Sequence, residues 1–184
     1  CCEAGIKVTA LPGAVACVTA LIISGLPTRR FCFEAFLPTD KKEHQRVLAE
    51  LQNETRTIVL YEAPHHLLRT LTELYEALGD RKASICRELT KKYETAFRTT
   101  LSQAVAYYTE NEPKGECVIV IEGKSVQEIE AEDQARWQQM SLEEHMEHYE
   151  SQGNSRKEAM KLVAKDRGVS KRDVYQALLE AEEA

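Results

Sequence analysis

Two polar residues, Tyr61 and Glu62, stand where a run of strand-forming residues, "TIVL", gives way to a proline and a leucine-rich segment. Pro64 occupies the first-turn position that proline prefers in helices, and the leucines behind it recur at helical spacing. A phenol ring and a carboxylate at the carboxyl end of a buried strand can hold a flat, hydroxylated ligand such as a nucleoside. The simpler alternative is an ordinary strand-to-helix turn in which Glu62 caps the helix or pairs with Arg87.

Three further segments have the same character, because they stand where predicted strands end. They are Pro12–Val15, Arg87–Thr90, and the two ends of the strand in "ECVIVIEG", Gly115–Cys117 and Glu122–Gly123. In sheets with parallel strands, ligands bind beyond the carboxyl ends of the strands, where helix N-termini and loop amides converge. The residue types therefore predict a nucleotide-sized site, but they do not by themselves specify a reaction.

Other kinds of site find no support in the residue order. His65 and His66 are adjacent on a predicted helix, so they face different directions and cannot chelate one metal together. The sequence has no Walker-type or G-x-G-x-x-G loop and no Ser-His-Asp or Cys-His arrangement. The cysteines are scattered without a C-x-x-C pair, which indicates reduced cytosolic thiols rather than a metal site. They are Cys1, Cys2, Cys17, Cys32, Cys86 and Cys117.

The size and composition predict a soluble, cytoplasmic protein. The chain has 184 residues, of which 43% are hydrophobic, enough for one domain with a smaller appendage. Its longest apolar run, near "AVACVTALIIS", is too short to span a bilayer, and no charged segment precedes it. We therefore expect neither a membrane anchor nor a signal peptide.

Charge is distributed unevenly along the chain, although the formal net charge is −6. Acidic residues are in excess over 124–150 and 180–183, whereas two other stretches, 81–98 and 155–172, are mostly basic. The second basic stretch contains Arg156, Lys157, Lys161, Lys165, Arg167, Lys171 and Arg172. Basic faces on an acidic protein predict contact with a polyanion.

Strands and helices alternate over residues 1–123. The predicted elements are a helix end closing at Gly5, a strand at Lys7–Leu11, a helix at Ala14–Ser24, a strand in "RFCFEAFLP", a helix at Asp40–Gln52, the strand "RTIVLY", a helix from Pro64 to Gly79, the strands "KASIC" and "TAFRTTL", a helix at Ser102–Asn111 and a strand in "ECVIVIEG". This order predicts an α/β domain, a mixed sheet flanked by helices. Because a protein rarely begins on a helix end, we expect a further domain upstream.

The composition turns polar and acidic after Gly123, and we expect a linker over residues 124–140. Residues 141–184 then predict a small helical domain, because three hydroxyl caps are each followed by a carboxylate three residues later. The pairs are Ser141 with Glu144, Ser155 with Glu158, and Ser170 with Asp173. The last two helices, joined by "RGVS", have helix-turn-helix spacing, and an αα-hairpin used for packing or dimerisation is the alternative.

Four segments resemble, in order and spacing, the tetrapyrrole methylase superfamily. They are "LPGAVACVTALIISGLPTRRFCFEAFLP", "RTIVLYEAPHHLLRTLTEL", "CRELTKKYE" and "KGECVIVIEG". Within it they are similar to the branch that methylates small-subunit ribosomal RNA (rRNA), and the helical tail is similar to the small C-terminal domain of that branch. The superfamily fold is implied to be two α/β domains with the cofactor in the cleft between them. The chain resembles the second domain plus the tail, and the glycine-rich first-domain motifs and a "DAGTP"-type segment have no counterpart.

The resemblance implies methyl transfer from S-adenosylmethionine to the ribose 2′-hydroxyl of a cytidine in the decoding centre, by a homodimer without a metal. The cofactor-facing positions that it implies are Pro12, Gly13, Ala14, Val15, Ala16, Tyr61, Glu62, Glu88, Leu89, Gly115, Glu116 and Cys117. The superfamily commonly has Pro-Ser at Ala14-Val15, and Ser and Arg at Ala63 and His66. The first departure removes a hydroxyl near the cofactor, and the second replaces a permanent cation with a histidine.

A 2′-hydroxyl is a poor nucleophile, so transfer needs alignment and a nearby hydrogen-bond acceptor, for which Glu62 and Glu88 are the candidates. The basic residues expected to contact RNA are Arg29, Arg30, Lys41, Lys42, His66, Lys91, Lys92, Arg156, Lys157, Lys171 and Arg172. With half of the cofactor site absent, we expect the chain alone to be inactive. Two alternatives remain, a methyltransferase acting on a tetrapyrrole macrocycle and a non-enzymatic RNA-binding module.

Overall fold

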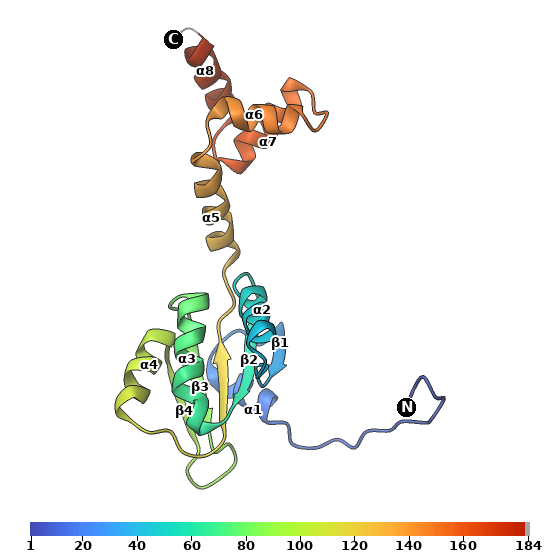
Figure 1. Cartoon of the computed structure of the whole chain (residues 1–184), viewed down its shortest axis with the longest axis vertical. Coiled ribbons are helices and arrows are strands. Elements are labelled where there is room, and N and C mark those ends of the chain that lie inside the picture. The colour runs from blue at the N-terminus through green and yellow to red at the C-terminus, as the bar shows by residue number, and fades with distance from the viewer. Residues whose placement is uncertain (183–184) are drawn as a thin grey trace. The chain divides into compact units, whose positions relative to one another are not determined.

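The computed structural model describes residues 1–182, which form two compact units, residues 1–124 and residues 125–182 (Figure 1). The elements of the first unit are α1 (Ala16–Ser24), β1 (Phe31–Ala35), α2 (Lys41–Leu51), β2 (Thr57–Glu62), α3 (Pro64–Leu78), β3 (Lys82–Arg87), β4 (Thr95–Thr100), α4 (Leu101–Glu110) and β5 (Cys117–Ile121). Those of the second unit are α5 (Val126–Gln138), α6 (Leu142–Glu150), α7 (Arg156–Asp166) and α8 (Lys171–Glu182).

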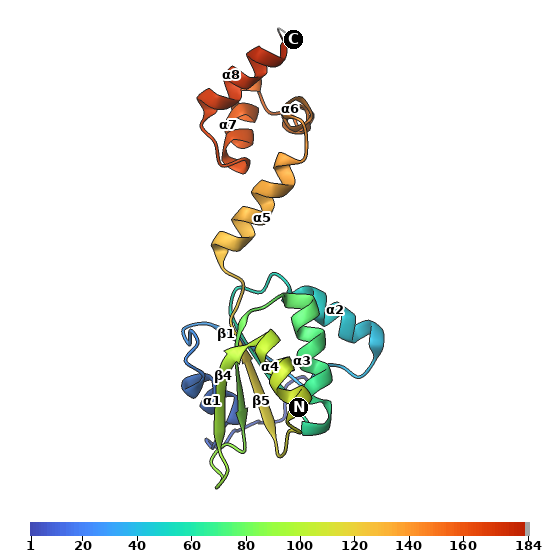
Figure 2. The same ribbon diagram turned by 90° about the vertical axis from the view of Figure 1, so that its left-hand side faces the viewer.

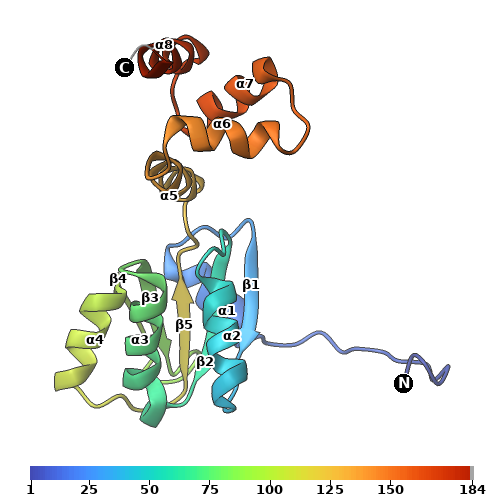
Figure 3. The same ribbon diagram turned by 45° about the horizontal axis from the view of Figure 1, so that its top comes forward.

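The strands of the first unit form a sheet in the order β1-β2-β5-β3-β4. β1 pairs with β2 in parallel, whereas β5 lies between β2 and β3 and is antiparallel to both (Figure 3). The predicted mixed sheet flanked by helices is confirmed. Since β1, β2 and β3 run in the same direction, their carboxyl ends lie at one edge of the sheet, together with the first residues of β5.

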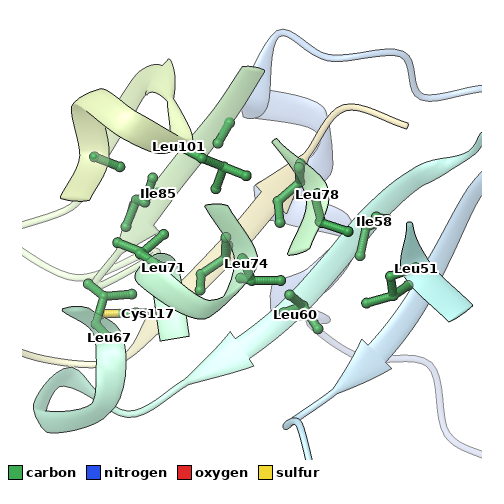
Figure 4. Close-up of a cluster of buried hydrophobic side chains, with 14 of the residues drawn as sticks. Leu51, Ile58, Leu60, Leu67, Leu71, Leu74, Leu78, Ile85, Leu101 and Cys117 are labelled. Atoms are coloured by element: carbon green, nitrogen blue, oxygen red, sulfur yellow. The ribbon is translucent and has the colours of Figure 1, made fainter. Parts of the chain in front are cut away.

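Helices cover both faces of this sheet. In Figure 2, α1 lies on one side and α2 and α3 on the other. The larger core forms where the leucines of α3 meet alternate residues of the strands, and Leu71, Leu74 and Ile85 in it are fully buried (Figure 4). On the opposite face, α1 packs Ala20 and Leu21 against Val59 and Val120.

Local sequence signals fix the bounds of several elements. Pro64 begins α3, and Gly79 ends it with a φ of 77°, a conformation that glycine adopts without strain. Asp40 caps α2 by accepting the N–H of Glu43 at 3.0 Å. These helices therefore begin and end close to the predicted positions.

The predicted strand at Lys7–Leu11 is absent, and the helix predicted from Ala14 begins at Ala16. Residues 6–15 are extended and exposed, with Leu11 93% exposed. A strand is stabilised by hydrogen bonds to a neighbouring strand, and within residues 1–182 none pairs with this segment. The local sequence alone was therefore a misleading signal here.

In the second unit, most of the segment predicted as a linker, residues 124–140, is the helix α5. The physical reason is a complete capping box, in which Ser125 and Glu128 satisfy each other's backbone N–H groups. The other three caps, at Ser141, Ser155 and Ser170, begin α6, α7 and α8. The core of this unit consists of Met146, Ala159, Val163, Ala164, Val174 and Leu178.

A buried polar cluster joins α5, α6 and α7 beside that core. The ring of His145, which is fully buried, stacks on Trp137 with the ring centroids 4.2 Å apart. Arg167 donates from Nε to His145 Nδ1 at 3.1 Å and from its terminal nitrogen to the carbonyls of Met140 and Ser141. The guanidinium therefore ties the end of α7 to the turn between α5 and α6. Among residues 1–182, no helix has the length and apolarity needed to cross a membrane.

Candidate functional site at one edge of the sheet

The edge where β1, β2 and β3 end gathers most of the predicted cofactor-facing positions of the first unit. Glu62 at the end of β2 and Arg87 at the end of β3 both pair with Cys117 at the start of β5. The turn Gly115–Glu116 and residues Glu88–Leu89 follow directly on these ends. Glu122 and Gly123, at the other end of β5, lie at the opposite edge, so they do not belong to this site.

Tyr61 connects this edge to the first helix. Its hydroxyl oxygen accepts the backbone N–H of Cys17, in the first turn of α1, at 3.1 Å. Its ring packs edge-on against Phe33, with the centroids 4.9 Å apart, and Phe36 lies 5.7 Å away. Burial raises the pKa of the Tyr61 phenol, which therefore stays protonated at neutral pH. The side chain of Cys17 also acts on this hydroxyl and raises the pKa further, so both the backbone and the side chain of Cys17 hold it in place.

The start of α1 is open at the predicted cofactor loop. Its N-cap, Val15, is extended and gives no side-chain hydrogen bond to the helix. Residues 12–14 before it are exposed. A helix N-terminus without a side-chain cap keeps backbone N–H groups available to an anionic or polar ligand. The absence of a serine hydroxyl at this position therefore leaves the amides of α1 as the polar groups of the loop.

Glu62 is held within the protein. Only 9% of it is exposed, and its carboxylate accepts the N–H of Ala63 at 2.7 Å and the hydroxyl of Thr70 at 2.6 Å. His66, a turn into α3, lies 3.9 Å from the same carboxylate. The bonds engage both oxygens, so Glu62 fixes the junction of β2 and α3. A residue in such a position orients its neighbours more readily than it takes up a proton.

Glu88 has a freer carboxylate on the other side of β5. Its Oε1 accepts the N–H of Glu116 at 3.0 Å, and Lys91 Nζ lies 3.3 Å from the same oxygen. These contacts, the Glu116 N–H first, hold the pKa of the Glu88 carboxyl below its ordinary value. Oε2 has no partner within residues 1–182. Glu88 is therefore an ionised acceptor with one oxygen open to a ligand.

Backbone strain gathers at the same edge. Ala35, Glu88 and Thr90 are the non-glycine residues with a positive φ among residues 1–182, and they stand at or just beyond the ends of β1 and β3. Gly115, opposite Glu88, has a φ of 79°, and a Cβ atom there would lie 2.1 Å from Glu88 Oε1. Strained conformations of this kind concentrate at functional sites, because packing must hold them in place.

Two cysteines of the sheet have unreactive thiols, Cys117 at the site and Cys32 near the opposite edge. Burial raises the pKa of both Cys117 and Cys32 to about 11, so neither is a thiolate at neutral pH. Leu89 is half-buried and packs against the smaller core, between α1 and the sheet. Within residues 1–182, no group of three or more His, Cys, Asp or Glu side chains could hold a metal ion.

The predicted RNA contacts of the first unit divide between the two edges. Lys41 and Lys42 begin α2, directly after the end of β1, and His66 lies in the first turn of α3. Lys91 and Lys92 lie in the loop after β3, where Lys91 also pairs with Glu116 at 3.1 Å. These five residues border the candidate site. Arg29 and Arg30 precede β1 and lie at the opposite edge.

The remaining predicted RNA contacts, Arg156, Lys157, Lys171 and Arg172, lie in the second unit. They occupy the first turns of α7 and α8.

Phe33 and Phe36, the aromatic neighbours of Tyr61, were not among the predicted site residues. The sequence pattern indicated only that they belong to a strand. Their exposure, 44% and 59%, is the feature that marks them as surface residues beside the site.

Comparison with known proteins agrees with this architecture. Residues 1–105 match the family described as Tetrapyrrole (Corrin/Porphyrin) Methylases. The chain is 45% identical to the Ribosomal RNA small subunit methyltransferase I of Bacillus subtilis over 95% of its length, and 47% identical to that of Halalkalibacterium halodurans over 93%. It spans 60% and 58% of the lengths of these two relatives. The solved structure of the methyltransferase CobJ has the same fold, with a TM-score of 0.51, 21% identity, and coverage of 66% of this chain and 53% of that one.

Proposed function

Because the chain belongs to the tetrapyrrole (corrin/porphyrin) methylase family, we propose that it is the second α/β domain and tail of an S-adenosylmethionine-dependent rRNA methyltransferase. The observation that carries this proposal is the similarity of nearly the whole chain, tail included, to relatives named for methylation of small-subunit rRNA. The family match itself ends at residue 105, whereas the similarity to these two relatives covers nearly the whole chain. Activity would belong to the longer protein, in the cytoplasm.

The target that we propose is the ribose 2′-hydroxyl of a cytidine in the decoding centre of the small subunit. S-adenosylmethionine would supply an already activated methyl group, so the protein contributes mainly alignment and a hydrogen-bond acceptor. Glu88 is the better candidate for the acceptor, because its Oε2 is open. Glu62 would instead hold the strand-to-helix junction in place through Ala63 and Thr70.

The groups at the sheet edge fit a nucleoside-containing cofactor. The Glu88 carboxylate could accept hydroxyl hydrogens, and the backbone N–H groups at the uncapped start of α1, other than that of Cys17, suit a carboxylate. Ala14, Val15, Gly115 and Cys117 would then contribute backbone contacts. The residues Pro12, Gly13, Ala16 and Leu89 complete the proposed cofactor-facing set.

Basic residues around this edge would bind the RNA backbone. Lys41, Lys42, His66, Lys91 and Lys92 border the site, and affinity supplied by such residues falls as salt is raised. Lys91 also holds Glu88 and Glu116, so it would serve both the site and the substrate. Arg29 and Arg30, at the other edge, would contact RNA that extends across the sheet.

We also propose a homodimer. The supporting observation is an exposed apolar stripe on α1, formed by Val15, Val18 and Ile22 at 48%, 40% and 68% exposure. Apolar surface of this kind is usually covered by a partner, and the three residues lie at helical spacing on one face.

The test is transfer of labelled methyl groups from S-adenosylmethionine to undermethylated small ribosomal subunits, followed by mapping of the modified nucleotide. We expect the longer parent protein to label a decoding-centre ribose and the 184-residue chain alone to transfer nothing. Label on a base rather than a ribose would contradict the 2′-hydroxyl target. No transfer to subunits by a parent that binds the cofactor would instead favour a small macrocyclic substrate.

A further inference from the structure

Positive charge in the second unit is segregated onto two helices. Seven of the eight Lys and Arg residues between 125 and 182 lie between Arg156 and Arg172, in α7, at its C-cap Arg167 and in the first turn of α8. Acidic residues dominate α5 and α6, so the basic surface stands out within a unit that carries more acidic than basic residues. Solubility would be served as well by interspersed charges, and segregation therefore calls for another explanation.

Three lysines form a straight row along α7. Lys157, Lys161 and Lys165 are exposed and follow one another at intervals of four residues, which places them on one side of the helix. Ala159 and Val163, on the other side, are fully buried in the core of the unit. At about 1.5 Å of rise per residue the row is about 12 Å long. Within residues 1–182 none of the three lysines forms an ion pair.

This arrangement is unfavourable for the helices themselves. Like charges four residues apart repel one another. Positive side chains in a first turn also oppose the helix dipole, and the first turns of α7 and α8 each hold two, Arg156 with Lys157 and Lys171 with Arg172. The capping carboxylates of Glu158 and Asp173 offset part of this effect. A fold that keeps three lysines in a row along α7 and two cations in the first turn of α8 indicates a ligand that compensates them.

We propose that the lysine row of α7, with the basic first turn of α8, binds the phosphate backbone of double-helical RNA. The proposal rests on the proposed function, because it assigns to the tail the task of holding rRNA. A rigid row of cations suits the regularly spaced phosphates of an A-form helix, which proteins recognise by shape and backbone contacts. Single strands are bound by stacking on aromatic side chains, and α7 contains none. A protein partner would need an apolar centre, which this row lacks.

The test uses the whole 184-residue chain and a hairpin with the sequence of a helix from the decoding end of small-subunit rRNA. The variant K157Q/K161Q/K165Q removes the row, and E143Q/E147Q/E150Q is the matched control, because these three carboxylates are exposed on α6. Affinity is measured at several salt concentrations. We expect the slope of log K against log salt to become shallower by about three units in the lysine variant and to stay unchanged in the control.

An unchanged slope in the lysine variant, or an equal loss in the control, would overturn the proposal. Tighter binding to a single strand, or to a DNA duplex of the same sequence, would also overturn it. So would an equal loss of affinity for polyglutamate, a polyanion without phosphates, in the lysine variant. A second readout is thermal unfolding followed by the fluorescence of Trp137. Removing the repelling lysines should raise the midpoint while affinity falls, whereas a merely structural role would lower both. A parent that transfers no methyl group would defeat the proposed function and leave this binding result standing.

Discussion

The hydroxyl oxygen of Tyr61 accepts the backbone N–H of Cys17 at 3.1 Å, and this bond joins residues that are 44 positions apart in the chain. It connects the end of β2 to the first turn of α1, so it sets the position of the predicted cofactor loop relative to the sheet edge. The same ring contacts Phe33 in β1. One side chain therefore holds three parts of the candidate site together.

Replacing Tyr61 with Phe should remove that bond and keep the ring contacts. We expect the free energy of unfolding to fall by about 0.5–1.5 kcal/mol, the usual net contribution of one hydrogen bond. Urea unfolding of the purified chain measures it. Y93F is the matched control, because Tyr93 is 69% exposed and its hydroxyl has no partner within residues 1–182. Equal losses in the two variants would show that the bond to Cys17 contributes nothing.

Replacing Glu62 with Gln should destabilise the fold, although the two side chains have the same size. In E62Q one of the two accepting oxygens becomes an NH₂ group that faces a donor, so Ala63 N–H or the Thr70 hydroxyl loses its acceptor. The cost of an unsatisfied buried donor is about 1–3 kcal/mol. A double-mutant cycle with T70V gives the coupling between the two side chains. E76Q, at an exposed position of the same helix, should be neutral, and a coupling of zero would contradict the role given to Glu62.

Gly115 and Gly25 form a natural pair for separating backbone strain from a clash. Both have a φ of 79°, but a Cβ atom at Gly115 would lie 2.1 Å from Glu88 Oε1, whereas at Gly25 the nearest atom, on the Arg98 side chain, would lie at an ordinary contact distance of 3.5 Å. Alanine at either position should cost about 1–2 kcal/mol through its positive φ. G115A should cost more than G25A, because it also displaces the Glu88 carboxylate from Glu116. Unfolding of the two variants by denaturant compares the costs, and G25A as the more damaging change would refute this reading of the turn.

His145 should make the second unit sensitive to acid. Burial, followed by the nearby Arg167, lowers the pKa of His145 below its ordinary value of 6.5, although Asp166 acts in the opposite direction. The unfolded chain therefore takes up this proton at a higher pH than the folded chain does. Stability is lost as the pH falls below about 6.5, and the loss continues down to the lowered folded pKa.

Thermal unfolding of the second unit at several pH values between about 8 and about 5 tests this prediction. These limits span roughly the range in which histidine titrates. Trp137, the one tryptophan of the chain, stacks on His145 and reports the transition by fluorescence. The variant H145Q should show a flatter dependence on pH, while H65Q, on an exposed histidine of the first unit, should behave as the unaltered chain does. A thermal unfolding midpoint that rises as the pH falls would contradict the lowered pKa of His145.

Elements with strong local signals were predictable, and those that depend on distant partners were not. Pro64 and Gly79 mark the ends of α3 in the sequence itself, because their backbone preferences act locally. The strand expected at Lys7–Leu11 did not form, because whether a strand forms depends on a neighbour that no local pattern encodes. The linker expected over residues 124–140 followed composition, although the capping box at Ser125 was the better signal.

The candidate site shows the same division. The order of elements was enough to predict strand ends at Tyr61, Glu62 and Glu88. The structure brings these three residues to one edge of the sheet. Their hydrogen bonds were beyond prediction, because Tyr61 meets Cys17 and Glu88 meets Glu116 across long stretches of chain. Periodicity reports which face of an element is buried, but not which side chain of another element it will touch.

The position of β5 has a consequence for how the protein is made. This strand is the last of the sheet to be synthesised, yet it lies between β2 and β3, so neither has its shared neighbour until residue 121 has left the ribosome. Until then, both strands expose unpaired edges and apolar faces, which are the features that lead nascent chains to associate with one another. Shielding of the growing chain by a chaperone would matter most while residues 63–116 are being added, and a ribosome stalled within that interval should carry an unfolded sheet.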